Sequence, residues 1–450
     1  MPTAASKPLG DNMTEDSCDV FVIGGGPAGS TVAALLAERG FHVVLAEKDR
    51  HPRFHIGESL LPLNMPLLDR LGVRDQVETI AMHKYAAEFN SPQHERIVTF
   101  DFGLAWDRSY PLAYQVKRSE FDQILFDHCV AKGAQAMQEC KVTAVELKGR
   151  DGAQVKTRAA DGAEQSWDAR FLVDASGRDT FLAGQLGIKK KNSKHNSAAL
   201  YSHFEGAQRL PGRAEGNISI FWFEHGWFWF IPLKDGVTSV GAVCWPYYLK
   251  TRRTDPSTFL LDTIALCPAL TARMEGSKLL QAATATGNYS YESRHMVGDG
   301  YILLGDAYAF VDPVFSSGVL LAMTSAFLGA DLIEAQLRTP ARAPALIRNY
   351  NRTMRHGVKN FSWFIYRMTS PAMRALFMNP QNHFRMQDAV LSLLAGDLFR
   401  GTPIYRSLRV FKTLYYVFSL FMLKQCVTAW LRRRRAIRDV GEISMTGSRA

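Results

Sequence analysis

The chain has 450 residues and a mass of 50.3 kDa, and its 47% hydrophobic and 21% charged residues exclude a disordered protein. The net charge of +10 lies mostly in the tail, where residues 404–450 hold ten Lys and Arg against two acids, and the nearly neutral body argues against nucleic-acid binding. Six scattered cysteines without a CxxC pair exclude a zinc ribbon and a disulfide scaffold, and they favour a reducing compartment. Residues 1–17 contain no apolar signal core and are predicted to be disordered, so we expect a cytoplasmic protein.

The first predicted elements are a strand, a glycine-rich turn, a helix and a second strand. Residues 19–23 form an apolar run that leads directly into Gly24-Gly25-Gly26-Pro27-Ala28-Gly29. Small apolar residues then predict a helix that ends near residue 40, and a strand over 42–46 closes with Glu47. The pattern G-x-G-x-x-G with an acid 18 residues after its last glycine is the fingerprint of a dinucleotide-binding βαβ unit.

Each residue of this fingerprint has an expected role in binding the dinucleotide. Gly24 permits the tight turn, Gly26 and Ala28 lie where the backbone approaches a pyrophosphate, and Gly29 allows the helix to pack closely on the strand. The free N–H groups at the helix start attract the phosphates, and Glu47 can accept hydrogen bonds from a ribose. A purely structural glycine turn is the alternative reading.

Segments further along the chain resemble the flavoprotein hydroxylase superfamily. They are the strand end Gly305-Asp306, Arg118 at the start of a predicted helix, and Asp174 with Gly177 after another apolar strand. In that superfamily the Gly-Asp pair binds the ribityl chain of the flavin and the arginine lies beside the cofactor, so the resemblance implies FAD. The alternative for Asp306 is a helix N-cap. A second G-x-G-x-x-G is absent from the sequence, so no nicotinamide domain is predicted.

Three longer segments resemble the flavin-dependent halogenases, and within them the branch that acts on phenols and pyrroles. These segments are residues 52–62, which include Ser59, residues 226–232 and residues 310–319. The second carries the motif W-x-W-x-I-P, formed by Trp227, Trp229, Ile231 and Pro232. The resemblance covers roughly residues 18–340, and it places Ser59 at the cofactor.

The resemblance implies a reaction in which FADH2 and O2 form a flavin C4a-hydroperoxide that oxidises chloride or bromide. Trp227, Trp229, Ile231 and Pro232 are expected to form a wall that keeps the aromatic substrate from the flavin, so that hypohalous acid forms instead of a hydroxylated product. Adjacent aromatic residues in a strand are also common in a plain hydrophobic core. The halide is expected at the N–H groups of Ser317 and Gly318, where a helix begins, although an ordinary loop and cap would look the same.

Lys84 is the candidate catalytic residue, because its segment matches the family segment that carries a lysine. An amine in an apolar tunnel could hold hypohalous acid and present the halogen to a carbon nucleophile. Desolvation would lower the pKa of such an amine, as the role of a neutral amine requires. A solvated surface lysine is the alternative.

One departure from the family concerns the substrate. Halogenases of free tryptophan have a glutamate before the Ser-Ser-Gly segment, where this chain has Phe315. The chain therefore favours an electron-rich phenol or pyrrole, either free or tethered to an acyl or peptidyl carrier protein. A separate flavin reductase is expected to supply the FADH2.

The tail beyond residue 404 is predicted to form one or two helices. Its uncharged run over residues 413–423 is shorter than the ~20 residues that span a bilayer, so no transmembrane helix is predicted there. Aromatic residues beside Arg432–Arg435 suit an anionic membrane surface, which would place the protein on the inner membrane face. Docking of an acidic carrier protein and a helix that merely covers the substrate domain are the alternatives. Residues 441–450 are expected to be frayed.

The predicted fold is an α/β flavoprotein with two domains and a helical C-terminal region. Residues 18–84, 112–182 and 291–340 form a Rossmann-like FAD-binding domain, residues 85–111 and 183–290 an antiparallel-sheet substrate domain, and residues 341–450 the helical region with the basic tail. An Asp-Gly turn at residues 235–236 is predicted to join two strands of the second sheet. Rival functions are a flavin monooxygenase, a geranylgeranyl-reductase-like enzyme, and a non-catalytic flavoprotein that docks a biosynthetic complex to a membrane.

Overall fold

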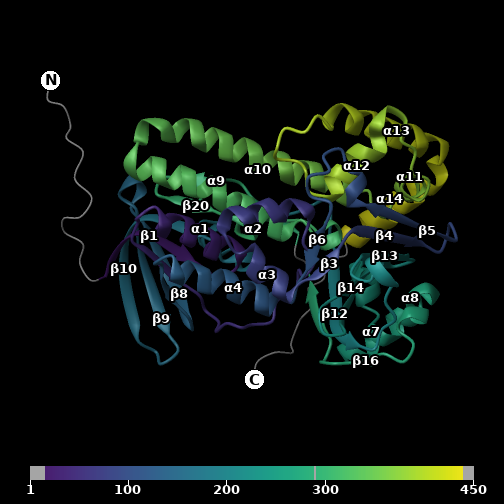
Figure 1. The fold of residues 1–450 in the computed structure, drawn as a ribbon, viewed down its shortest axis with the longest axis horizontal. Helices are drawn as coiled ribbons and strands as arrows, with labels where there is room; N and C mark the ends of the chain where they lie inside the picture. Colours follow the sequence, from purple (N-terminus) through teal and green to yellow (C-terminus); the bar gives the residue numbers. More distant parts are fainter. Residues whose placement is uncertain (1–15, 288–289, 439–450) are drawn as a thin grey trace.

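The structure, a computed structural model, describes residues 16–287 and 290–438. Figure 1 shows an elongated molecule with one sheet in each half and long helices along one side. The strand β1 begins at Ser17, so the predicted disordered segment 1–17 is too long at its end, and residues 1–15 lie outside the described residues.

The first sheet holds the βαβ unit. Its strand order is β19-β20-β10-β1-β2-β7, with β1, β2, β7, β10 and β20 parallel. The bounds are β1 (Ser17–Ile23), β2 (Val43–Ala46), β7 (Gln135–Met137), β10 (Glu164–Asp174), β19 (Val297–Gly298) and β20 (Tyr301–Leu303), with β8 (Cys140–Leu147) and β9 (Ala153–Ala159) added beside β10.

Helices bury this sheet, which explains why its central strands are continuously apolar. Helix α1 packs against α4 and α9, and α9 packs against α10. Their bounds are α1 (Pro27–Glu38), α4 (Arg118–Ala131), α9 (Gly318–Arg338) and α10 (Ala343–Ile365). Short helices α2 (Met65–Leu71), α3 (Arg74–Ile80) and α5 (Phe181–Gln185) complete this half.

The second sheet has the order β16-β12-β15-β14-β13-β4-β5, with β17 also paired to β12, and only β13 and β4 are parallel neighbours. The bounds are β4 (Ala86–Ser91), β5 (Arg96–Asp101), β12 (Ala198–Glu205), β13 (Ile218–Phe223), β14 (Gly226–Pro232), β15 (Val237–Cys244), β16 (Lys278–Leu279) and β17 (Thr284–Gly287). The turn between β14 and β15 has positive φ at Asp235 (59°) and Gly236 (76°), as an Asp-Gly hairpin turn requires.

Alternation along β14 separates two apolar faces. Phe228 and Phe230 pack toward α7 (Pro256–Ala265) and α8 (Pro268–Arg273), near α6 (Pro246–Leu249). Trp227 and Trp229 face the opposite side, in one core with the C-terminal helices.

Two small sheets join the halves. The ribbon of β3 (Met82–Lys84) and β6 (Ala113–Gln115) carries Lys84, and a second sheet pairs β11 (Lys189–Lys191), β18 (Tyr291–Ser293) and β21 (Ala309–Phe310). Strand β11 therefore lies outside the large antiparallel sheet, although its residues belong to the predicted substrate domain.

The C-terminal region is mostly helical over its described residues. Its further helices are α11 (Pro371–Met378), α12 (Met386–Leu394), α13 (Tyr405–Phe421) and α14 (Leu423–Arg438). Helix α11 packs on β4 and β5, and α13 on α11 and α12, so this region covers the second sheet (Figure 1). The predicted fraying of residues 441–450 lies outside the described residues.

One described helix, α9, is long and apolar enough to cross a bilayer, but 67% of its apolar window is buried inside the protein. Helices α13 and α14 pass the same test only as a pair, and they are bent by 100° at their junction. By length and composition, no other helix among residues 16–287 and 290–438 qualifies.

Candidate functional site

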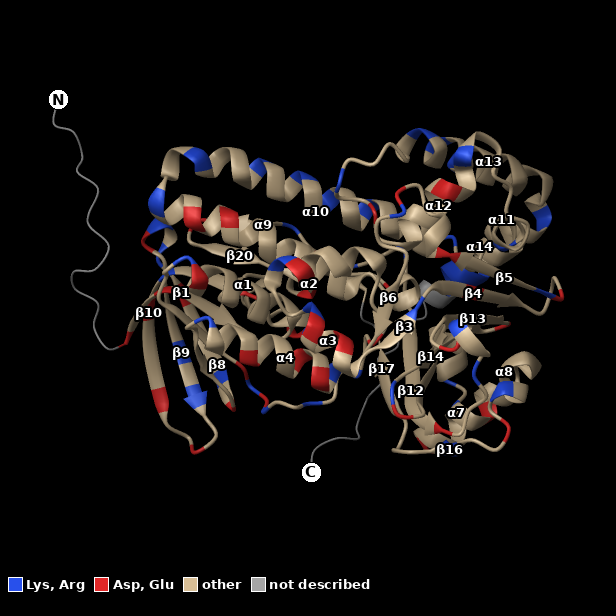
Figure 2. Cartoon of the chain, in the orientation of Figure 1, with Lys and Arg blue, Asp and Glu red and all other residues tan. Residues whose placement is uncertain are grey.

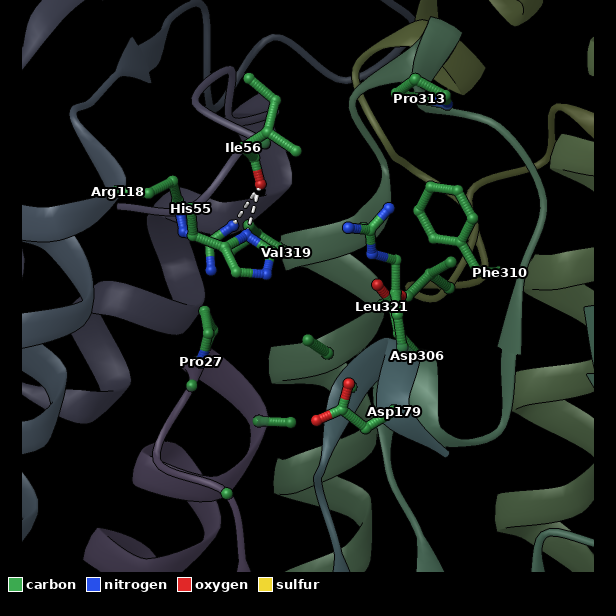
Figure 3. Close-up of a pocket in the computed structure, with 18 of the residues that line it drawn as sticks. Pro27, His55, Ile56, Arg118, Asp179, Asp306, Phe310, Pro313, Val319 and Leu321 are labelled. Atoms are coloured by element: carbon green, nitrogen blue, oxygen red, sulfur yellow. Dashed lines mark hydrogen bonds between the residues drawn. The ribbon is translucent and has the colours of Figure 1, made fainter. Parts of the chain in front are cut away.

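A cavity of about 470 Å³ lies between the two sheets and the starts of helices α1 and α9. Its walls include Gly24 and Glu47 from the first sheet, Trp227 and Trp229 from the second, and Ser317 at the start of α9. Figure 3 shows Arg118 and His55 on one side of this space, and Asp306 and Phe310 on the other. The cavity therefore brings together residues from Ile23 to Ile365, which lie far apart in the chain.

The glycine-rich turn has the geometry of a phosphate cradle. Gly24 has φ +96°, and a Cβ there would lie 2.6 Å from the carbonyl oxygen of Ala175. A Cβ on Gly29 would lie 1.9 Å from the carbonyl oxygen of Gly24, so only glycine lets α1 approach the strand this closely. At Gly26 the same atom would meet only Arg53, at 3.6 Å, so this residue borders the open side of the turn.

Helix α1 begins at Pro27 without a side-chain cap on its N–H groups. These donors and Ala28 lie at the cavity wall, where they are available to a pyrophosphate. Glu47 is 3% exposed; one carboxylate oxygen accepts from the Gly25 N–H at 2.7 Å and the other from Asp49 N–H at 3.0 Å. Arg53 Nη2 also lies 3.5 Å from this carboxylate. The acid is thereby fixed at the strand end, where it can accept hydrogen bonds from a ribose.

Arg118 and Asp306 lie further along the cavity. Arg118 forms two hydrogen bonds to Asp122, at 2.7 and 2.8 Å, and donates to the carbonyl of Ile56 at 3.1 Å (Figure 3). Burial raises the pKa of Asp306 to about 6, although Arg178 and Arg118 oppose the rise. Asp306 lies inside a short 3₁₀ turn whose N-cap is Leu304, so the alternative reading of Asp306 as an N-cap is wrong.

Gly29 and Gly305 do not line the cavity in the described part of the chain. Gly305 has φ +52° and its N–H donates to Ser325 Oγ at 2.9 Å. Both glycines shape the backbone that presents their neighbours. Together, the open glycine cradle, the uncapped helix start and the acid at the strand end fit a bound FAD.

Two tryptophans and an isoleucine of β14 form one wall of the cavity. Trp227 and Trp229 are each 4% exposed, with ring centroids 6.1 Å apart, and Ile231 follows on the same face. The Trp229 Nε1–H donates to Ser239 Oγ at 3.1 Å, which fixes the indole. Pro232 is buried but is not part of the wall, because the next residue of a strand faces the opposite side.

The loop before α9 brings N–H groups to the same cavity. Ser316 adopts a left-handed conformation with φ +53°, and Ser317 and Gly318 then begin the helix without a side-chain cap. Both residues line the cavity, and a Cβ on Gly318 would meet nothing within 4 Å. This open helix start has the donors that a halide needs.

Lys84 is buried, with 1% of its surface exposed, so the alternative of a solvated surface lysine is wrong. Its amine donates to Ser59 Oγ and to the carbonyl of Leu60, both at 2.9 Å, and lies 5.3 Å from the Phe102 ring centroid. Burial lowers the pKa of Lys84 to about 7. Ser59 lines the cavity and Lys84 does not, so the amine lies one side chain behind the wall.

Phe315 is 3% exposed and packs against Phe364, with ring centroids 6.3 Å apart. No carboxylate can therefore act from this position. Among the described residues, no group of three His, Cys, Asp or Glu could hold a metal ion, and all six cysteines are free.

Sequence reasoning missed several residues that line the cavity. Phe361 and Ile365 come from α10, which the motifs did not reach. Phe54, stacked 6.2 Å from Tyr201, also borders it, and only its place two residues after Pro52 in the family-like segment could have indicated this.

The comparisons with known proteins agree with this geometry. The family model of an FAD binding domain matches residues 17–361. A 1H-pyrrole-2-carbonyl-[peptidyl-carrier protein] chlorinase of Pseudomonas fluorescens is 30% identical over 417 residues, which is 86% of this chain and 91% of that protein. The other similar proteins, a tryptophan 2-halogenase of Chondromyces crocatus and several flavin-dependent halogenases, are longer, and the chain spans 61–68% of their length.

Solved structures give the same result. The myxobacterial chondrochloren halogenase CndH is 32% identical with a TM-score of 0.75, over 90% of this chain and 97% of that one. A flavoprotein/dehydrogenase from Cytophaga hutchinsonii is 29% identical with a TM-score of 0.81, over 90% of this chain and all of that one. These matches extend beyond residue 340, so the resemblance continues past the end expected from the sequence.

Proposed function

The chain belongs to the flavin-dependent halogenase family and is a halogenating oxidoreductase that uses FAD, and from this premise we propose that it halogenates an electron-rich phenol or pyrrole. The observation that carries the halogenation step is the amine of Lys84, which lies buried directly behind the cavity wall at Ser59.

The cavity divides the work between its residues. The α1 N–H groups, Glu47, Arg118 and Asp306 would hold FAD, which in its reduced form activates O2 so that a halide is oxidised. Trp229 and its neighbours on β14 exclude a bulky substrate from the flavin end. The N–H groups at Ser317 and Gly318 would hold the chloride or bromide.

Lys84 is suited to carry the halogen onward. Because the pKa of Lys84 is about 7, the amine is neutral in roughly half of the protein molecules at neutral pH. A neutral amine has a free electron pair. The hydrogen bonds to Ser59 and Leu60 fix its position. The amine can therefore bind an electrophilic halogen from hypohalous acid in a region that excludes water.

We infer the substrate class from the residue at position 315. Phe315 occupies the place of the glutamate that would assist an unactivated indole, so the ring must supply its own electrons from a phenol oxygen or pyrrole nitrogen. The Pseudomonas relative is named for a pyrrole on a peptidyl carrier protein. We propose a phenol or pyrrole, free or carrier-bound, and a separate reductase as the source of FADH2.

Mass spectrometry of reaction products tests this proposal. The protein is incubated with chemically reduced FAD, O2, chloride and matched free and carrier-bound phenols and pyrroles. We expect the two-isotope pattern of chlorine in the product, and no product when chloride is omitted. A product that gains oxygen without needing a halide would support a monooxygenase instead.

We also propose that the bent helix pair α13–α14, residues 405–438, binds an anionic membrane surface. Its exposed apolar residues reach 69% exposure at Leu420, 85% at Phe421 and 53% at Trp430. Residues 405–438 contain no Asp or Glu, and exposed Lys and Arg follow the apolar residues along α14. Figure 2 places these helices at the end of the molecule opposite β8 and β9. Apolar side chains beside cations suit a lipid surface.

Vesicle sedimentation tests whether the helix pair α13–α14 binds membranes. The protein should bind phosphatidylglycerol vesicles and not phosphatidylcholine vesicles, and the double variant Phe421→Ser/Trp430→Ser should lose binding. Ile97→Ser, at a 57% exposed site on β5, is the control. Binding of an acidic carrier protein without vesicle binding would overturn the membrane proposal.

A further inference from the structure

Three side chains connect helix α14 to the loop that precedes α9. Arg433 Nη2 donates to the carbonyl of Lys194 at 2.9 Å and to His195 Nδ1 at 3.2 Å. His195 Nε2 donates to Asp312 Oδ2 at 2.7 Å. Arg433 has donors only and an ionised carboxylate has acceptors only, so a neutral His195 with its proton on Nε2 satisfies both contacts.

Arg433 is half-buried where it meets this link, which distinguishes it from its neighbours. His195 is 7% exposed and Asp312 5% exposed, whereas Arg432, Arg434 and Arg435 are exposed. The Arg433 guanidinium lies 5.8 Å from the ring centroid of Trp245 and 5.6 Å from that of Tyr366. Burial lowers the pKa of Arg433 to about 10. The side chain of Arg433 is therefore not part of the exposed, positively charged face of α14.

Asp312 is the point where the link meets the cavity. Its Oδ2 also accepts from Ser197 Oγ at 2.9 Å, and its Oδ1 accepts from the Val314 N–H at 3.1 Å, which begins the 3₁₀ turn Pro313–Phe315. Ser316, whose backbone has a left-handed conformation, follows directly and turns the chain into α9. Asp312 borders the main cavity together with Ser317 and Gly318.

The conformation of this short loop decides where the Ser317 and Gly318 N–H groups point. Only the turn at Pro313–Phe315 and the strained Ser316 lie between Asp312 and these donors. A carboxylate buried at 5% exposure needs its partners, because an unpaired buried charge is costly. Loss of a partner from Asp312 would therefore move the loop.

We propose that Arg433 and His195 are positioning residues for the halide: they hold Asp312, and through it the Ser317 and Gly318 N–H groups, in the halide-binding geometry. The inference rests on the proposed function, in which the start of α9 holds the halide. Helix α14 thereby acts on a step of the reaction although it touches neither flavin nor halide.

Steady-state kinetics and equilibrium binding test the link in the FAD-loaded, full-length protein. For Arg433→Gln we expect the chloride KM to rise about tenfold, while kcat at saturating chloride stays within about twofold, because only halide binding is weakened. His195→Phe should behave alike, and Arg433→Lys, which keeps a donor and the charge, should recover part of the loss. Arg406→Gln, at an exposed arginine of α13, is the matched control and should leave the chloride KM unchanged.

Isothermal titration with bromide supplies a readout that does not depend on turnover. We expect the bromide Kd of Arg433→Gln to rise by the same factor, with an unchanged FAD Kd. An unchanged chloride KM and bromide Kd in both variants would overturn the link, as would a joint loss of FAD affinity and kcat, which would indicate a merely structural role. If the wild-type protein binds bromide but makes no halogenated product, the proposed function fails, and the comparison of bromide Kd values still decides the link.

Discussion

The pH dependence of stability gives a direct test of the buried amine. The pKa of Lys84 falls from 10.5 to about 7 on folding because its charged form is desolvated. Between these two values the unfolded chain binds more protons than the folded protein. The free energy of unfolding therefore rises with pH in this window, and the cost of burying the charge is largest below pH 7.

The size of the effect follows from the shift. One pKa unit corresponds to about 1.4 kcal/mol, so the full contribution of Lys84 is on the order of 5 kcal/mol, of which about 2 kcal/mol appears between pH 7 and pH 9. Lys84→Met removes this contribution. The variant also loses the hydrogen bonds to Ser59 and Leu60, but that loss is nearly the same at pH 7 and pH 9 and cancels in the comparison.

Urea denaturation of the wild type and of Lys84→Met at pH 7 and pH 9, with the same FAD loading, measures the difference. We expect the stability of the wild type relative to the variant to increase by about 2 kcal/mol from pH 7 to pH 9. Equal pH dependence in the two proteins would refute the argument, because it would mean that the amine is not desolvated.

Three further substitutions test other parts of the site. Gly29→Ala should abolish FAD binding, measured by flavin fluorescence, because its Cβ would lie 1.9 Å from the Gly24 carbonyl oxygen; retained FAD affinity would contradict the close approach of α1. In Gly241→Ala the new Cβ would lie 2.2 Å from the Trp229 indole and should displace it. We expect a loss of about 1–3 kcal/mol in stability and a loss of halogenating activity. An unchanged melting temperature would show that the indole is not packed there. Phe315→Glu should destabilise the protein by about 3 kcal/mol or more, because it buries an unpaired carboxylate, and should not confer activity on indole; a stable variant that halogenates indole would contradict the assignment of this position.

Local pattern was sufficient to predict the βαβ unit and the β14–β15 hairpin. The apolar run before Gly24 and the Asp235-Gly236 turn specify their own backbone geometry, since few other residues adopt those conformations. The alternation of a strand also predicts that Trp227, Trp229 and Ile231 share one face, and the same period places Pro232 on the other.

The parts that sequence could not supply depend on contacts between distant elements. No local feature of α10 indicates that Phe361 reaches the cavity. In the sequence, Arg433 cannot be distinguished from the three arginines beside it, and only the packing of α14 against His195 shows its contact. The position of Lys84 behind Ser59 depends in the same way on how β3 pairs with β6. In each case burial arises from tertiary packing, which a single sequence does not display.

We propose that the halogen passes through the amine of Lys84 on its way to the substrate. The measurement that tests it compares two quantities in Lys84→Met and wild type: oxidised halide captured by an added scavenger when substrate is absent, and halogenated product when substrate is present. We predict equal captured halide and a loss of product of about a hundredfold or more, equivalent to about 3 kcal/mol in the barrier. A Lys84→Met protein that halogenates its substrate at the wild-type rate would show that the halogen does not pass through this amine.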